Sequence, residues 1–127
     1  MPKRKKKTVL LVDDESLWLN AAKEVVVGSG FRAIVVASGE EALQALRKDV
    51  PDVIITDVRM PVMNGFDLYV KVRENPAWSK VPIIFMSAID DYDAKKVARD
   101  LGVDGYISKP FGVEDLKQAM NATLKNL

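Results

Sequence analysis

The chain has 127 residues, of which 48% are hydrophobic and 29% charged, and its formal net charge is +1. These values are typical of one soluble globular domain, and no stretch approaches the roughly 20 apolar residues of a membrane-spanning helix. The sequence has no cysteine and no histidine, which excludes disulfides, thiolate metal sites and every mechanism built on histidine. Any chemistry must use carboxylates, hydroxyls and lysine, and we expect a cytoplasmic protein.

A basic segment, Lys-Arg-Lys-Lys-Lys at residues 3–7, supplies five of the positive charges. Without it the chain has 14 basic and 18 acidic residues, a formal charge of −4. A mildly acidic body lacks the charge footprint of a nucleic-acid-binding domain. We interpret residues 1–7 as a disordered tail and residues 8–127 as one folded domain; contact of the tail with nucleic acid or anionic lipid is the alternative.

Strand and helix signals alternate five times along the rest of the chain. The strands are short runs rich in Val and Ile, and the helices show apolar residues at spacings of three and four. In chain order we predict a strand at Thr8–Val12, a helix at about Ser16–Val27, a strand at Ala33–Val36, a helix from Ser38 to before Pro51, a strand at Val53–Thr56, a helix from Asn64 to Asn75, a strand at Val81–Met86, a helix that Gly102 caps, a strand at Gly105–Ser108 and a last helix from Val113 to the end of the chain.

Each helix has an apolar side that should pack on the sheet. From the first helix to the last, the residues predicted on these apolar sides are Leu17, Ala21 and Val25; Ala42, Leu43, Ala45 and Leu46; Phe66, Val72 and either Tyr69 or Val70; Ala94, Val97, Ala98 and Leu101; and Val113, Leu116, Met120, Leu124 and Leu127. The segment Ser38-Gly-Glu-Glu41 has the form of a capping box, which supports the start of the second helix.

The alternation leaves no spare segment and predicts the fold class. Continuous apolar strands are typical of a sheet that is covered on both faces, and right-handed crossovers place helices on both sides. We predict a three-layer α/β fold with a doubly wound, five-stranded parallel sheet of order 2-1-3-4-5, which is flavodoxin-like. In such sheets, ligands bind beyond the carboxyl ends of the strands where the order reverses, here between strands one and three.

Acidic residues stand at this switch point: Asp13 and Asp14 follow the first strand, and Asp57 follows the third. An aspartate at a strand end is by itself often only a helix cap. However, two ionised carboxylates about 4 Å apart repel by about 4 kcal/mol at an effective dielectric of 20, so a cluster of three needs a cation or a shared proton. Ser87 and Lys109 fall at strand ends on the same edge. The pattern predicts an acidic pocket with Mg²⁺ as the favoured cation.

These residues give the chain a clear resemblance to the response-regulator receiver domains of two-component signalling, and it is similar to the single-domain chemotaxis regulator. The matching motifs are Leu-Leu-Val-Asp13-Asp14, Asp57-Val-Arg-Met-Pro61-x-Met-Asn-Gly65, Ser87-Ala88 and Lys109-Pro110-Phe111. The resemblance extends from Thr8 to the C-terminus. It implies a phosphoprotein of phosphorelay signal transduction that catalyses only its own phosphorylation and dephosphorylation and is not otherwise an enzyme.

The resemblance implies a role for each site residue. Asp57 would accept a phosphoryl group from the phosphohistidine of a sensor kinase or phosphotransfer protein. Mg²⁺, with Mn²⁺ as the alternative, would be held by Asp13, Asp14, Asp57 and the backbone carbonyl of Arg59. Lys109, typically followed by a cis peptide bond, would contact the phosphoryl group.

The resemblance also implies a switch and a partner surface. Ser87 would bond to a phosphoryl oxygen, and Tyr106 would rotate inward to fill the space that its loop leaves. The face with Lys95, Arg99, Tyr106 and the last helix would meet an output protein or effector domain, or form a dimer through the last two helices and strand five.

Two positions beside the site bear on the lifetime of a phosphorylated state. Arg59 could shield a phosphoryl group or pair with an acidic neighbour. Ile89 is apolar and offers no group that orients an attacking water. We therefore expect a comparatively long-lived phosphorylated state.

Four alternatives stay open. Gly28-Ser-Gly30-Phe-Arg-Ala33 fits a dinucleotide-binding pattern, but it follows a helix and leads into a strand, the reverse of what that site needs. A haloacid-dehalogenase-type phosphatase needs a second aspartate where Arg59 stands. An interaction module that keeps the fold without phosphorylation usually loses site residues, which are complete here. The chain could also be the receiver part of a longer regulator.

Overall fold

The computed structural model describes residues 6–124 and contains one five-stranded parallel sheet of order β2-β1-β3-β4-β5. The elements in chain order are β1 (Thr8–Val12), α1 (Ser16–Gly28), β2 (Arg32–Val36), α2 (Gly39–Lys48), β3 (Val53–Asp57), α3 (Gly65–Glu74), β4 (Ile83–Ala88), α4 (Tyr92–Leu101), β5 (Gly105–Lys109) and α5 (Val113–Leu124). The predicted α/β class, strand order and switch point between β1 and β3 are confirmed.

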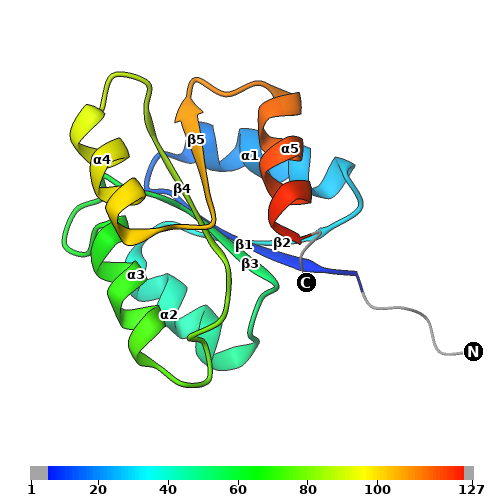
Figure 1. The fold of residues 1–127 in the computed structure, drawn as a ribbon. Coiled ribbons are helices and arrows are strands. Elements are labelled where there is room, and N and C mark those ends of the chain that lie inside the picture. Colours follow the sequence, from blue (N-terminus) through cyan, green and yellow to red (C-terminus); the bar gives the residue numbers. More distant parts are fainter. Residues whose placement is uncertain (1–5, 125–127) are drawn as a thin grey trace, which may run out of the picture.

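The sheet lies between two layers of helices, with α1 and α5 on one face and α2, α3 and α4 on the other (Figure 1). Alternate residues of each strand point to opposite faces of a sheet. In β1, Leu10 and Val12 accordingly join the cluster under α2, α3 and α4, whereas Val9 and Leu11 join the cluster under α1 and α5. This two-sided burial explains why the strands read as unbroken apolar runs.

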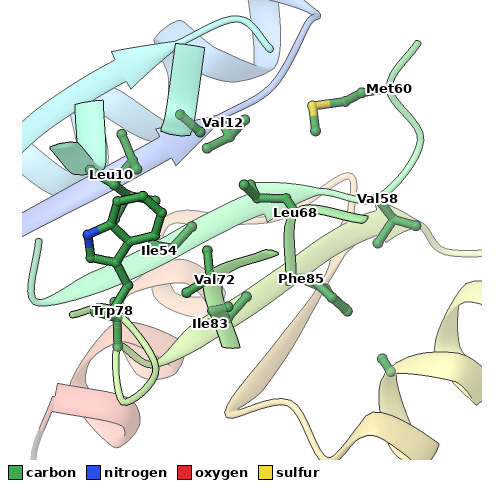
Figure 2. Close-up of a cluster of buried hydrophobic side chains, with 14 of the residues drawn as sticks. Leu10, Val12, Ile54, Val58, Met60, Leu68, Val72, Trp78, Ile83 and Phe85 are labelled. Carbon is green, nitrogen blue, oxygen red and sulfur yellow. The ribbon is translucent and has the colours of Figure 1, made fainter. Parts of the chain in front are cut away.

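The larger of the two cores lies under α2, α3 and α4 (Figure 2). Phe85 of β4 is fully buried in it, and the rings of Phe66 and Tyr69 from α3 meet the Phe85 ring edge-on at 5.5 and 6.0 Å between centroids. Trp78, from the segment between α3 and β4, closes one end of this core. The packing fixes α3 against the strand that carries Ser87.

Four strands differ from prediction at one or both ends, and β2 begins one residue earlier than predicted, at Arg32. β4 begins at Ile83, because Pro82 has no N–H to give to the ladder, and it continues to Ala88. β3 includes Asp57 and β5 includes Lys109, so both residues are the last of their strands and do not follow them. Main-chain pairing of Asp57 with Met86 and of Lys109 with Ala88 holds these ends in register.

Some helix faces were predicted wrongly at their edges. Leu17 is 78% exposed, and Val97 and Val113 are also exposed. The buried residues of α1 are Ala22 and Val26, which shows that the face that packs on the sheet lies one position further along than Leu17, Ala21 and Val25 suggest. In α3, Tyr69 packs on the core and Val70 is exposed, while Leu68, absent from the prediction, is fully buried.

The helix starts are capped by side chains. Ser38 Oγ accepts a hydrogen bond from the Glu41 amide at 3.1 Å, as predicted, but the Glu41 carboxylate accepts from Ala37 and not from Ser38 itself. α3 has a complete capping box between Asn64 and Asp67 that was not predicted. This box orders the chain just after the loop that leaves Asp57.

Two predictions fall partly outside residues 6–124. Lys6 and Lys7 are exposed, but residues 1–5 of the predicted disordered tail lie outside the described part of the chain. Residues 125–127, with Leu127 of the predicted last helix face, also lie outside it. Within the described residues, the structure contains no helix with the length and apolar character to cross a membrane.

Candidate functional site: an acidic pocket at the strand ends

The predicted site residues meet at the carboxyl edge of the sheet. Asp13 directly follows β1, Asp57 and Lys109 are the last residues of β3 and β5, and Ser87 is the second-to-last residue of β4. The side chains of these four residues are buried, an unusual environment for two carboxylates and a lysine. Asp14, by contrast, is exposed at the mouth. The parallel register of neighbouring strands is what brings these distant positions together.

Lys109 is the cation at the centre of the site. Its ammonium group lies 2.6 Å from Asp13 Oδ2, 3.4 Å from Asp57 Oδ1 and 3.6 Å from Glu15 Oε1. The peptide bond that follows it, Lys109-Pro110, is cis, as the resemblance implied. In this structure Lys109 therefore partly neutralises the carboxylates that would otherwise repel one another.

The electrostatics of the pocket raise the pKa of Asp57 to about 6, against an ordinary value of 3.8. Burial is the main cause, the charge of Asp13 adds to it, and Lys109 opposes it. Burial also disfavours the charged form of Lys109, but its hydrogen bond with Asp13 and the charges of both aspartates leave the pKa of Lys109 raised. Lys109 thus stays an ammonium group in the pocket.

Four carboxylates are close enough to share one metal ion. The carboxylates of Asp13, Asp14, Glu15 and Asp57 each offer an oxygen, and these oxygens lie within 4.8 Å of one another. A set of oxygen donors only is what Mg²⁺ prefers. The donor set fits a hard divalent cation. Glu15 was not predicted, because a single acid at the start of a helix has no distinctive sequence signal.

A close approach of the backbone shapes the loop after Asp57. The Gly65 amide donates to the Val58 carbonyl at 2.9 Å, and a Cβ on Gly65 would lie only 2.6 Å from the carbonyl oxygen of Asp57. Only glycine fits at this contact. In the same loop Val62 has a φ of +69°, a left-handed conformation that costs a β-branched residue roughly 1–2 kcal/mol. The Met63 amide donates to the Pro61 carbonyl at 2.8 Å across this residue and closes the turn.

Arg59 pairs with an acidic neighbour, one of the two arrangements foreseen from the sequence. Its Nε and Nη2 donate to the two carboxylate oxygens of Asp91 at 2.9 and 3.0 Å. The hydrogen bond between them raises the pKa of Arg59 and lowers that of Asp91. Asp91 is also the N-cap of α4 and accepts from the Ala94 amide at 3.1 Å. Asp91 was missed in the sequence analysis, because only the fold places it opposite Arg59.

The two predicted switch residues contact each other. The hydroxyl groups of Ser87 and Tyr106 share a hydrogen bond, and the Tyr106 ring is half-buried against the core under α2, α3 and α4. Burial is the main cause that raises the pKa of Tyr106, with the negative charges of Asp91 and Asp57 adding to it. The phenol is therefore neutral and can donate or accept at Ser87.

A cavity of about 290 Å³ opens over Asp57. It is lined by Glu15, Trp18, Asp57, Arg59, Ala88, Asp91, Lys109 and Pro110. Trp18, another residue that the sequence analysis missed, forms its wall: its ring lies 5.2 Å from that of Phe111 and 5.5 Å from the Lys109 ammonium. Larger hollows lie elsewhere, one of about 890 Å³ between the start of β1 and the end of α1, but they contain none of the predicted catalytic or metal-binding residues.

Comparison with known proteins agrees with this geometry. The chain matches the response regulator receiver domain family over residues 9–121. It is 34% identical over 117 residues to the transcriptional regulatory protein KdpE of Mycobacterium tuberculosis, covering 92% of this chain and 50% of KdpE. It is also similar to the solved structure of the chemotaxis response regulator CheY4 of Vibrio cholerae, with a TM-score of 0.86, 31% identity and coverage of 94% of this chain and 100% of CheY4.

The chain belongs to the response regulator receiver domain family, a domain of two-component systems. It spans about half the length of the curated relatives that it matches, such as KdpE.

Proposed function

We propose that the protein is a phosphoacceptor receiver that takes a phosphoryl group onto Asp57 from the phosphohistidine of a sensor kinase or phosphotransfer protein. The burial of Asp57 beside Lys109 and the acid pair is the observation that carries this proposal. A carboxylate nucleophile needs to be ionised, and a pKa of about 6 leaves Asp57 ionised at neutral pH while keeping it poorly solvated. Such a carboxylate has less hydration to lose on reaction.

The donor set for the metal would consist of the carboxylates of Asp13, Asp14 and Asp57 and the backbone carbonyl of Arg59, with Glu15 at the rim. Mg²⁺, or Mn²⁺ as the alternative, would supply neutralisation of the carboxylate cluster and of the negative charge on the transferring phosphoryl oxygens. Asp14 is exposed at the mouth, so it is accessible to an ion that arrives from solvent.

In the proposed transfer, an Asp57 carboxylate oxygen attacks phosphorus and forms an acyl phosphate. The bond between phosphorus and the donor imidazole nitrogen breaks, and the imidazole leaves with the electron pair. The Lys109 ammonium, 3.4 Å from Asp57 Oδ1, is placed to pair with a phosphoryl oxygen. Ser87, at the end of the neighbouring strand, offers a hydroxyl as a further donor.

The output would follow from a change of partners at Ser87. The Ser87 hydroxyl has one proton, so donating it to a phosphoryl oxygen leaves Ser87 only as an acceptor for Tyr106, and a shift of Ser87 toward the phosphoryl group would lengthen that bond and let the tyrosine move inward. A phosphoryl group adds about −1.5 to −2 charges, and it must favour one state by about 5.5 kcal/mol to move a switch from 1:99 to 99:1. The altered surface would be α4, β5 and α5, with Lys95, Arg99 and Tyr106, as a site for an output partner or for dimerisation.

The relatives suggest where this output leads. KdpE is a transcriptional regulatory protein, and this chain matches only half of it. The chain could thus be the receiver part of a longer regulator, whereas the coverage of all of CheY4 equally supports a single-domain regulator. A module that works without phosphorylation is the remaining alternative.

The experiment that tests the proposal is intact mass after incubation with acetyl phosphate, with and without Mg²⁺, for the wild type and Asp57→Asn. We expect a gain of one phosphoryl group that requires Mg²⁺ and is absent in the variant. Absence of a gain in a wild-type protein that binds Mg²⁺ in a separate titration would favour the phosphorylation-independent module.

The environment of Asp57 also predicts a slow loss of the phosphoryl group. Ile89 is 60% exposed, directly follows Ala88 of the cavity wall and has no group that could orient water, and Arg59 lines the same cavity as Asp57. We expect Ile89→Glu to shorten the half-life of the acyl phosphate several-fold, within the range of general acid–base effects. The half-life is read from the decay of the phosphorylated mass after donor removal. A half-life unchanged in Ile89→Glu, with Val97→Glu as the exposed control, would contradict the prediction.

A further inference from the structure

The pair between Arg59 and Asp91 connects the acceptor loop with the start of α4. Arg59 stands two residues after Asp57, and its side chain is 59% exposed. The Asp91 side chain is only 15% exposed, and its carboxylate accepts hydrogen bonds from three donors: Arg59 Nε, Arg59 Nη2 and the Ala94 amide. The arginine is thus the accessible member of the pair and the aspartate the anchored one.

Both members line the cavity over Asp57, the place where a phosphoryl group would stand. The Arg59 guanidinium has planar, paired donors that fit a phosphoryl group as well as they fit a carboxylate. A phosphoryl group carries about −1.5 to −2 charges against the single charge of Asp91, so it is the stronger partner for the same guanidinium. Arg59 therefore has two competing anionic partners in one cavity.

We propose that Asp91 is a positioning residue that holds Arg59 away from the phosphoryl site, and that phosphorylation of Asp57 transfers Arg59 from Asp91 to the phosphoryl group. This inference rests on the proposed function and extends it. The two arrangements of Arg59 then follow each other in time: Arg59 pairs with Asp91 before phosphorylation and shields the phosphoryl group after it. The transfer leaves Asp91, the N-cap of α4, without its ion-pair partner Arg59.

The exchange has a measurable consequence for anion binding. If part of the binding energy is used to break the Arg59–Asp91 pair, removal of the Asp91 charge should strengthen binding of a phosphoryl-like anion. Loss of a negative charge near the pocket would also strengthen binding by a general electrostatic effect. Only an effect that requires Arg59 identifies the exchange.

The test uses beryllofluoride as the phosphoryl mimic, titrated in Mg²⁺ and excess fluoride and followed by the fluorescence of Trp18, which lines the cavity. The variants are Asp91→Asn, Arg59→Met and the double variant. Asparagine keeps an oxygen for the helix cap, and circular dichroism checks the fold. Asp93→Asn is the matched control for a general charge effect, because Asp93 lies in the first turn of α4 and its charge also acts on Arg59, but the structure records no ion pair between them.

We expect Asp91→Asn to tighten beryllofluoride binding about two- to fivefold, the range that a partly exposed ion pair supports, and Arg59→Met to weaken it. In the Arg59→Met background, Asp91→Asn should keep only the small general electrostatic gain, the same gain that Asp93→Asn should give in either background. An equal gain with and without Arg59, or no gain at all, would overturn the inference. Failure of the wild type to bind beryllofluoride or accept phosphoryl groups would overturn the proposed function as well, whereas normal binding without coupling would overturn the exchange alone.

Discussion

Replacing Lys109 by methionine is expected to lower the free energy of unfolding of the metal-free protein by about 3–5 kcal/mol, the range for removing one partner of a buried ion pair. Methionine fills much of the lysine volume but leaves Asp13, which is fully buried, and Asp57, which is 4% exposed, without their shared cation. The loss is read from urea unfolding in EDTA.

Two further variants separate the charge effect from packing. Adding Asp13→Asn to Lys109→Met should recover much of the loss, because it removes the carboxylate that lies 2.6 Å from the missing ammonium. Lys23→Met, at an exposed position of α1, should change stability by less than about 0.5 kcal/mol. A small loss in Lys109→Met, or a loss that Asp13→Asn does not relieve, would contradict the role assigned to Lys109.

Asp57→Asn is expected to raise the stability of the metal-free protein by about 3 kcal/mol at pH 7.5, because the pKa of Asp57 is about 6 when folded and 3.8 when unfolded. The folded state binds the Asp57 proton more tightly than the unfolded state does. The cost in folding free energy of ionising Asp57 therefore reaches its full size above about pH 6 and is absent below about pH 3.8. Stability of the wild type relative to Asp57→Asn should therefore rise as pH falls through this window. Asparagine resembles the protonated form at every pH.

The measurement is the difference in unfolding free energy between wild type and Asp57→Asn in EDTA at several pH values, with Asp100→Asn, an exposed acid of α4, as the control. Addition of Mg²⁺ at pH 7.5 should narrow this difference in unfolding free energy. An ion that binds only the folded state stabilises that state, and the wild type keeps the Asp57 carboxylate that would hold the ion. A difference that is independent of pH would contradict the assignment of the raised pKa to Asp57.

The fold could be predicted because its signals are local or follow general rules. Runs such as Val9–Val12 and Val53–Ile55 show strands buried on both faces, and the order of the sheet follows from the crossover rules. Asp13, Asp57, Ser87 and Lys109 could be brought together because parallel strands place their carboxyl ends on one edge. Exact strand ends could not be predicted, because pairing with a neighbour, as between Lys109 and Ala88, decides whether a polar residue belongs to a strand.

The rest of the site depends on contacts between distant segments. The pairing of Arg59 with Asp91 joins two loops, and the place of Trp18 against Phe111 depends on the angle of α1 over the sheet. Leu17 shows the same limit: its helical spacing suggests a buried residue, but α1 packs on the sheet through Ala22 and Val26, and Leu17 lies off that face in solvent. Periodicity predicts that a helix has an apolar face, whereas packing decides which side of the helix is buried.

The most direct test of the proposed phosphoacceptor is chemical location of the phosphoryl group. The protein is incubated with Mg²⁺ and phosphoramidate, a donor with a phosphorus–nitrogen bond, and is then reduced with borohydride, which converts an aspartyl phosphate to homoserine. Peptide mass analysis should find homoserine at position 57 and at no other aspartate, and none in the sample without Mg²⁺. Homoserine at Asp13 or Asp14, or none at position 57 although the protein has bound Mg²⁺, would contradict the assignment of Asp57 as the phosphoacceptor.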